Sequence, residues 1–188
     1  MIILGVDPGT LVTGYGIIEG TGRSIKMRTY DVIRNRGITS LPIRLKTIYR
    51  ALEDVINRYH PDEFAIETAF YGKNVQSALK IGHARGIAIL SAVLREIPTT
   101  EYSPREVKKA VVGNGTASKE QVQFMVKTLL RMRETPKFFD ATDALAVAIC
   151  HYHRITAPRA KYSDWKTYVE SHPERIVTQS HPRTRRSL

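Results

Sequence analysis

The stretch Met1-Ile-Ile-Leu-Gly-Val-Asp-Pro-Gly-Thr10 decides the fold, because an apolar run ends there on a carboxylate and a Pro-Gly turn. The apolar residues from 2 to 6, interrupted only by Gly5, predict a strand that is buried on both faces of a sheet. Asp7 lies at the carboxyl end of this strand, which is where ligands bind in open α/β sheets. In the alternative interpretation, Asp7 only bonds nearby backbone within an Asp-Pro-Gly turn.

The elements that follow are typical of a mixed sheet. Short connections join the first strand to two more, and such connections predict antiparallel neighbours. Crossover helices then predict two further strands parallel to the first. The expected elements are strands at 13–19 and 24–33, a helix at 41–59, a strand at 64–66, a helix at 75–96, a strand at 98–102, helices beginning at 104 and 119, and a helix at 138–153. We therefore predict an α/β fold with a five-stranded mixed sheet, an antiparallel meander plus two parallel strands, flanked by helices.

The composition indicates one globular domain with a polyanionic partner. With 188 residues, 42% hydrophobic and 25% charged, the chain can bury a substantial core. Its 29 Lys and Arg against 18 Asp and Glu give a formal charge of +11, which favours nucleic acid over a membrane surface. A purely solubilising charge is the alternative. We expect a domain at 1–156 and a basic, weakly ordered tail at 157–188, where hydrophobic periodicity fades.

Cysteine content and hydropathy argue against a disulfide-bonded, a zinc-binding or a membrane-spanning protein. Cys150 is the only cysteine, so an intrachain disulfide is excluded and a Cys-based zinc site lacks ligands. No apolar stretch reaches the ~20 residues of a membrane span, and no signal peptide precedes the first strand. We therefore expect a cytoplasmic protein with no membrane contact. The histidines do not suggest a metal site: His151 and His153 diverge on a helix, and His83 is expected to be a packing residue.

Four carboxylates stand at the ends of predicted buried elements. Glu67 ends the strand at 64–66, and Asp140 and Asp143 open the last helix at i and i+3, on one side. Ordinary helix capping is the alternative role for those two. If the strands ending on Asp7 and Glu67 are parallel, both carboxylates emerge at the same edge of the sheet. The sequence therefore predicts a convergent acidic site.

Such a site in a very basic protein requires a neutralising cation. Oxygen donors without Cys or suitably spaced His favour Mg²⁺, with Mn²⁺ as a substitute. Two such ions ~3.5–4 Å apart are the usual arrangement for phosphodiester hydrolysis. We therefore predict two ions per site, bound by Asp7, Glu67, Asp140 and Asp143.

Basic and aromatic residues near these carboxylates are candidates for DNA contact. Lys119 falls in the first turn of a helix, where a cation opposes the dipole, so a role in the site competes with that of a solvated lysine. The segment Phe70-Tyr-Gly-Lys-Asn74 follows Glu67 and suits base stacking and phosphate contact, although loop aromatics also pack into cores. The predicted DNA-binding residues are Phe70, Tyr71, Lys73, Asn74, Arg85, Lys108 and Lys119.

A set of motifs resembles the RuvC family of bacterial Holliday-junction resolvases. The motifs lie in family order over about residues 1–155: Asp7-Pro-Gly, Ala65-Ile-Glu67 with Phe70 and Lys73-Asn74, Ser77-Ala-Leu-Lys80 with Ala84-Arg-Gly86, Val107-Lys108 with Val111-Val-Gly113, and Asp140-Ala-Thr-Asp-Ala-Leu-Ala146. The resemblance implies a ribonuclease H-like fold and a homodimeric, metal-dependent endonuclease that makes paired symmetric nicks in four-way DNA junctions, leaving 5′-phosphate and 3′-hydroxyl ends. It also implies work in recombination and repair beside RuvA–RuvB.

The same resemblance suggests roles for individual residues. The four carboxylates match the catalytic acidic set, Lys108 and Lys119 match basic residues of the active site, and Phe70 matches an aromatic near the junction centre. Two other functions are alternatives to a junction endonuclease. The opening Asp7-Pro-Gly-Thr10 with Gly14 also resembles sugar kinases and actin-like ATPases, which need a second large domain that 188 residues cannot supply. A non-enzymatic nucleic-acid module would explain the charge but not four convergent carboxylates.

Overall fold

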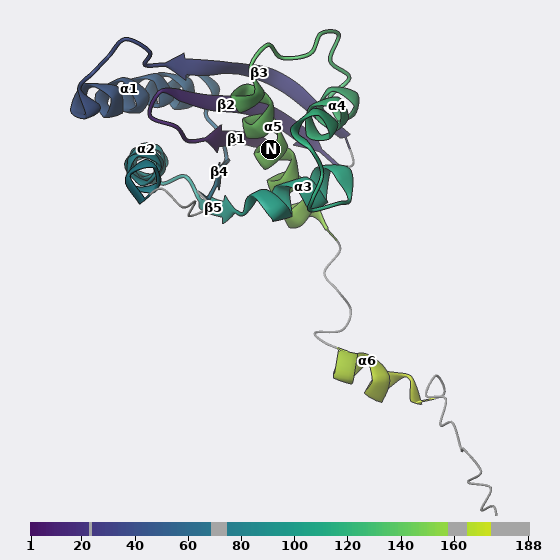
Figure 1. The fold of residues 1–188 in the computed structure, drawn as a ribbon. Coiled ribbons are helices and arrows are strands. Elements are labelled where there is room, and N and C mark those ends of the chain that lie inside the picture. The colour runs from purple at the N-terminus through teal and green to yellow at the C-terminus, as the bar shows by residue number, and fades with distance from the viewer. Residues whose placement is uncertain (23, 69–74, 158–164, 174–188) are drawn as a thin grey trace, which may run out of the picture. The chain divides into compact units, whose positions relative to one another are not determined.

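The computed structural model describes residues 1–22, 24–68, 75–157 and 165–173 (Figure 1). The chain divides into two compact units, Met1–Thr156 and Ala157–Leu188. The second unit contains the helix α6 (Trp165–Ser171), which the sequence analysis did not predict. Within the ranges just given, none of the helices combines the length and apolar character that crossing a membrane requires.

The first unit is built on a five-stranded sheet in the order β3-β2-β1-β4-β5. β1 pairs antiparallel with β2 and parallel with β4, β2 pairs antiparallel with β3, and β4 pairs parallel with β5. The predicted meander plus two parallel strands is therefore confirmed, and the carboxyl ends of β1 and β4 lie at the same edge. The strands are β1 (Ile2–Asp7), β2 (Val12–Thr21), β3 (Ser24–Arg34), β4 (Glu63–Glu67) and β5 (Thr99–Tyr102).

Helices cover both faces of the sheet (Figure 1). Because side chains alternate along a strand, Leu4 and Ile3 of β1 belong to different hydrophobic clusters. Leu4 packs with α1 (Leu41–Tyr59) and α2 (Val75–Val93), whereas Ile3 packs with the other three helices of the first unit. Those three are α3 (Pro104–Val112), α4 (Lys119–Leu129) and α5 (Phe139–Thr156).

α5 lies directly against β1 and β2 because glycines face it. A Cβ atom added to Gly14 would collide with the backbone carbonyl of Asp140, and one added to Gly5 would collide with the backbone at Ala144 and Ala148. We call this set the glycine track; its members are Gly5, Gly14, Gly16 and Gly20. The track brings the first turn of α5 beside the end of β1, where Asp7 lies opposite Gly14.

α3 and α4 begin as predicted, each with a complete capping box. Ser103 pairs with Glu106 at the start of α3, and Ser118 pairs with Gln121 at the start of α4. These reciprocal bonds satisfy free amides of the first turn and fix where each helix starts. Lys108 and Lys119 therefore have defined positions, in α3 and in the first turn of α4.

One packing prediction for α2 is wrong. His83 was expected to pack inside the protein, but it is exposed. The buried face of α2 is formed by Ala84, Ala88 and Ala92, which are spaced four residues apart. His83 does not share this spacing, so its side chain lies off the buried face. α2 also ends at Val93, three residues earlier than predicted.

Candidate active site

A pocket of about 200 Å³ lies at the carboxyl edge of the parallel strands. Asp7 and Glu67 enter it from the last positions of β1 and β4, and Asp143 enters from the second turn of α5. Lys108 and Lys119 line the same pocket from α3 and α4. Pro104, Val107 and Val122 complete its wall. Three predicted carboxylates and both predicted lysines therefore converge on one small cavity.

The acidic side chains of this pocket resist ionisation. Burial raises the pKa of Asp7 well above its ordinary value, and the nearby charges of Glu67 and Asp143 raise it further. Burial also raises the pKa of Glu67 to about 7, with an added contribution from Asp143. The pKa of Asp143 is raised by burial as well, although Lys119 opposes this effect. A cation among these groups would relieve both the desolvation and the mutual repulsion.

Lys119 provides part of that compensation. Its Nζ lies 3.3 Å from Oδ2 of Asp143, and the pKa of Lys119 is raised chiefly by that carboxylate. The Lys119 side chain is 63% exposed, whereas the Asp143 side chain is only 17% exposed. The ammonium group therefore stands at the open mouth of the pocket, where a phosphate could reach it.

Asp140 belongs to the same acidic environment but does not line the pocket. It lies one turn before Asp143 in α5, is partly buried, and contributes to the raised pKa of Asp7. The structure therefore brings Asp7, Glu67 and Asp143 to the cavity itself and leaves Asp140 at its border.

The donor chemistry of the site fits a hard divalent cation. Carboxylate oxygens are the acidic donors here, and they are the ligands that Mg²⁺ and Mn²⁺ prefer. Among the described residues, no three Asp, Glu, His or Cys side chains already form a cluster that could hold an ion.

The predicted DNA-binding residues are only partly located. Phe70, Tyr71, Lys73 and Asn74 lie outside the described residues. Arg85 lies in α2, where its guanidinium forms an ion pair with Glu101 of β5. That pairing holds Arg85 against the sheet, and its role in DNA binding stays a prediction.

Two features around the site were not predicted from the sequence. Gly14 was considered only for its likeness to the opening of sugar kinases and actin-like ATPases, whereas Gly14 and Gly16 are places where α5 touches β2. Their spacing on one face of a strand was the available signal, since glycine in a strand often marks a close approach of another backbone. The second feature is the hydrogen bond between Tyr102 and His151, which lie 49 positions apart.

Comparisons with known proteins agree with this arrangement. A family model described as "Crossover junction endodeoxyribonuclease RuvC" matches residues 3–151. The chain is 54% identical over 151 residues to the RuvC of Desulforamulus reducens, covering 80% of this chain and 93% of the relative. It is 46% identical to the RuvC of Salinibacter ruber, covering 94% and 99%.

A solved structure is similar as well. RuvC of T. thermophilus, in complex with a Holliday junction substrate, matches with a TM-score of 0.79 and 29% sequence identity. The match covers 83% of this chain and 95% of that one. The predicted ribonuclease H-like fold is therefore confirmed.

Proposed function

Because this chain belongs to the RuvC family of crossover junction endodeoxyribonucleases, we propose that it resolves four-way DNA junctions by metal-dependent hydrolysis of phosphodiesters. The observation that carries this proposal is the convergence of Asp7, Glu67 and Asp143 with two lysines on one pocket. A pocket of buried acids suits a divalent metal, and the lysines suit a phosphate. The T. thermophilus relative was solved with a Holliday junction, which supports the same substrate class here.

In this proposal the four carboxylates hold two Mg²⁺ ions, for which Mn²⁺ can substitute. Asp7, Glu67 and Asp143 line the pocket, and Asp140 would join them from its border. When bound, the ions would activate a water and stabilise the leaving oxygen, which yields 5′-phosphate and 3′-hydroxyl ends. The carboxylates would be held ionised by the metal, because their pKa values are otherwise raised by burial.

The lysines would hold the substrate backbone. Lys119 is exposed and only 3.3 Å from Asp143, so it can contact a phosphate while it remains beside the acidic groups. Lys108 lines the pocket from α3 and would approach the same phosphate from that side. The net charge of +11 would provide the wider attraction to DNA.

We also propose a homodimer built on α2. The face of α2 that turns away from the sheet exposes Leu79, Leu90 and Val93, and added Cβ atoms at Gly82 and Gly86 would meet open space. A second copy of the same helix could pack closely there, because glycines permit backbones to approach. Two sites are needed for paired nicks. Cooperation with RuvA–RuvB and a cytoplasmic location are further expectations that follow from the family alone.

A cleavage assay tests the proposal. A four-way junction labelled on each strand is incubated with the chain and Mg²⁺, with EDTA and with ATP without Mg²⁺. We expect symmetric nicks in Mg²⁺ alone, whereas a linear duplex of the same sequence should stay intact. Asp7→Asn should bind the junction without cutting it, since it loses a metal ligand but keeps the lysines. Substantial cleavage by Asp7→Asn would contradict the acidic site.

A further inference from the structure

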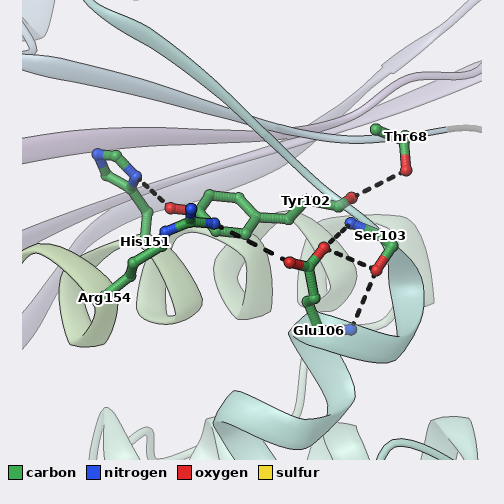
Figure 2. A network of polar contacts seen from close by, with 6 residues as sticks. All are labelled: Thr68, Tyr102, Ser103, Glu106, His151 and Arg154. Atoms are coloured by element: carbon green, nitrogen blue, oxygen red, sulfur yellow. Dashed lines mark hydrogen bonds and ion pairs between the residues drawn. The ribbon is translucent and has the colours of Figure 1, made fainter. Parts of the chain in front are cut away.

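A buried hydrogen bond joins the sheet to α5 behind the candidate active site. Tyr102 is the last residue of β5 and His151 lies in α5, and both side chains are almost fully buried. The Tyr102 hydroxyl lies 2.8 Å from Nδ1 of His151 (Figure 2). Neither residue lines the acidic pocket, and the proposed cleavage makes no direct use of them. Their bond nevertheless ties the position of α5 to the end of β5.

The backbone of Tyr102 fixes the chain next to Glu67. The carbonyl oxygen of Tyr102 accepts a hydrogen bond from the Thr68 amide at 2.8 Å. It accepts another from the Thr68 hydroxyl at 3.2 Å (Figure 2). Thr68 follows Glu67 directly, so these bonds determine where β4 delivers that carboxylate. A single residue, Tyr102, therefore binds both the acidic end of β4 and the helix that carries Asp143.

The next residue extends the connection to α3. Ser103 caps α3: its amide donates to the Glu106 carboxylate at 2.8 Å, and its hydroxyl accepts from the Glu106 amide at 3.3 Å. On the outer side, Arg154 of α5 lies 3.9 Å from the Glu106 carboxylate (Figure 2). Because α3 carries Lys108 into the pocket, the network joins three of the elements that supply site residues.

The chemistry of His151 suits a fixed structural contact. Burial lowers its pKa, and the nearby Glu63 carboxylate, 3.4 Å from Nε2, opposes this effect. A neutral ring with its proton on Nε2, on the Glu63 side, accepts a hydrogen bond from the Tyr102 hydroxyl at Nδ1. The Tyr102 hydroxyl is therefore the hydrogen-bond partner that orients the ring, whereas Nε2 approaches Glu63 without a hydrogen bond.

We propose that Tyr102 and His151 are positioning residues. They hold β4, α3 and α5 at fixed positions relative to one another, so that the pocket residues on these elements are correctly placed for cleavage. The inference rests on the proposed junction cleavage and adds residues outside the pocket to it. A displacement of only ~1 Å among reacting groups can lower a rate about 10²-fold. Loss of the Tyr102–His151 bond should therefore reduce the rate of cleavage while leaving DNA binding unchanged.

The test is Tyr102→Phe in the full chain, measured by single-turnover cleavage at saturating enzyme and Mg²⁺. We expect the rate to fall about tenfold or more, and junction affinity in EDTA to stay within about twofold. Tyr152→Phe is the matched control, because the Tyr152 hydroxyl, also on α5, donates to the Gly22 carbonyl at 2.7 Å, and neither Tyr152 nor Gly22 lines the pocket. This control loses a comparable hydrogen bond and should keep the parent rate.

A second pair of variants separates positioning from simple stability. His151→Asn places an amide group near the position of Nδ1, so it can still accept from Tyr102, whereas His151→Leu cannot. We expect His151→Asn to retain at least about one third of the parent rate and His151→Leu to fall about tenfold. Equal rates for Tyr102→Phe and Tyr152→Phe, or for the two His151 variants, would overturn the inference. Absence of cleavage by the unchanged chain would refute the proposed function together with this inference.

Discussion

Replacing Glu67 with Gln should stabilise the metal-free protein, and the effect should depend on pH. Burial raises the pKa of Glu67 from 4.5 to about 7 in the folded chain. The folded chain then keeps a proton that the unfolded chain releases as the pH rises from 4.5 to 7. Stability therefore falls with rising pH across this window, because the folded state binds the extra proton. Glu67→Gln removes the titrating group, so the variant should not lose this stability as the pH rises.

The magnitude follows from the pKa difference. A change from 4.5 to about 7 corresponds to about 3 kcal/mol. The free energy of unfolding of the variant should equal that of the parent near pH 4.5. At pH 7.5 it should exceed the parent value by up to about 3 kcal/mol, which corresponds to ~6–12 °C in midpoint temperature. The pKa of Asp7 should fall as well when the Glu67 charge is lost, which acts in the same direction.

Urea unfolding in EDTA at a series of pH values measures this difference. Glu134→Gln, which changes an exposed carboxylate, is the control and should follow the parent curve. Adding Mg²⁺ at pH 7.5 should stabilise the parent more than Glu67→Gln, since only the parent keeps the full donor set. A stability difference between Glu67→Gln and the parent that stays constant from pH 4.5 to 7.5 would refute the reasoning.

Three further changes test other parts of the site. Lys119→Ala should lower the rate of single-turnover cleavage by about 10²–10³. The control Lys127→Ala, later in the same helix, should leave this rate unchanged. A loss for Lys119→Ala below about threefold, or ~0.65 kcal/mol, would show that Lys119 is only a solvated lysine. Gly14→Ala should displace the first turn of α5 at Asp140, which should lower the free energy of unfolding in urea by ~1–3 kcal/mol. The cleavage rate should fall to a small part of the parent rate. An unchanged cleavage rate would contradict the role given to the glycine track. Leu90→Lys should convert a dimer to monomers in sedimentation while the circular dichroism stays the same, and a parent that is already monomeric would exclude the α2 dimer.

Much of the fold and the acidic site could be predicted because local patterns determine them. The apolar run ending on Asp7 marked a buried strand, and the shortness of the next connections fixed the antiparallel meander. Once β4 had to be parallel to β1, Glu67 had to emerge beside Asp7, so topology alone brought the two carboxylates together. Capping boxes located the helices that carry Lys108 and Lys119.

The remaining features depend on contacts that no local pattern encodes. His83 lies in a helix with apolar residues on much of its circumference, and periodicity alone could not decide which side meets the sheet. The Tyr102–His151 bond requires knowledge of how α5 crosses the strands. The position of Asp140 at the border of the pocket, one turn from Asp143, likewise depends on how far α5 extends over the end of β1.

The contact of α5 with the glycine track has a consequence for the newly made chain. Asp7 belongs to the first strand of the first unit, whereas Asp143 belongs to the last helix of that unit. The sheet can form earlier, but Gly5 and Gly14 stay uncovered until α5 arrives. Pairing segments so distant in sequence is slow, because the loop between them must close first. The acidic pocket of a nascent chain therefore stays incomplete until α5 has been synthesised and has packed against the sheet.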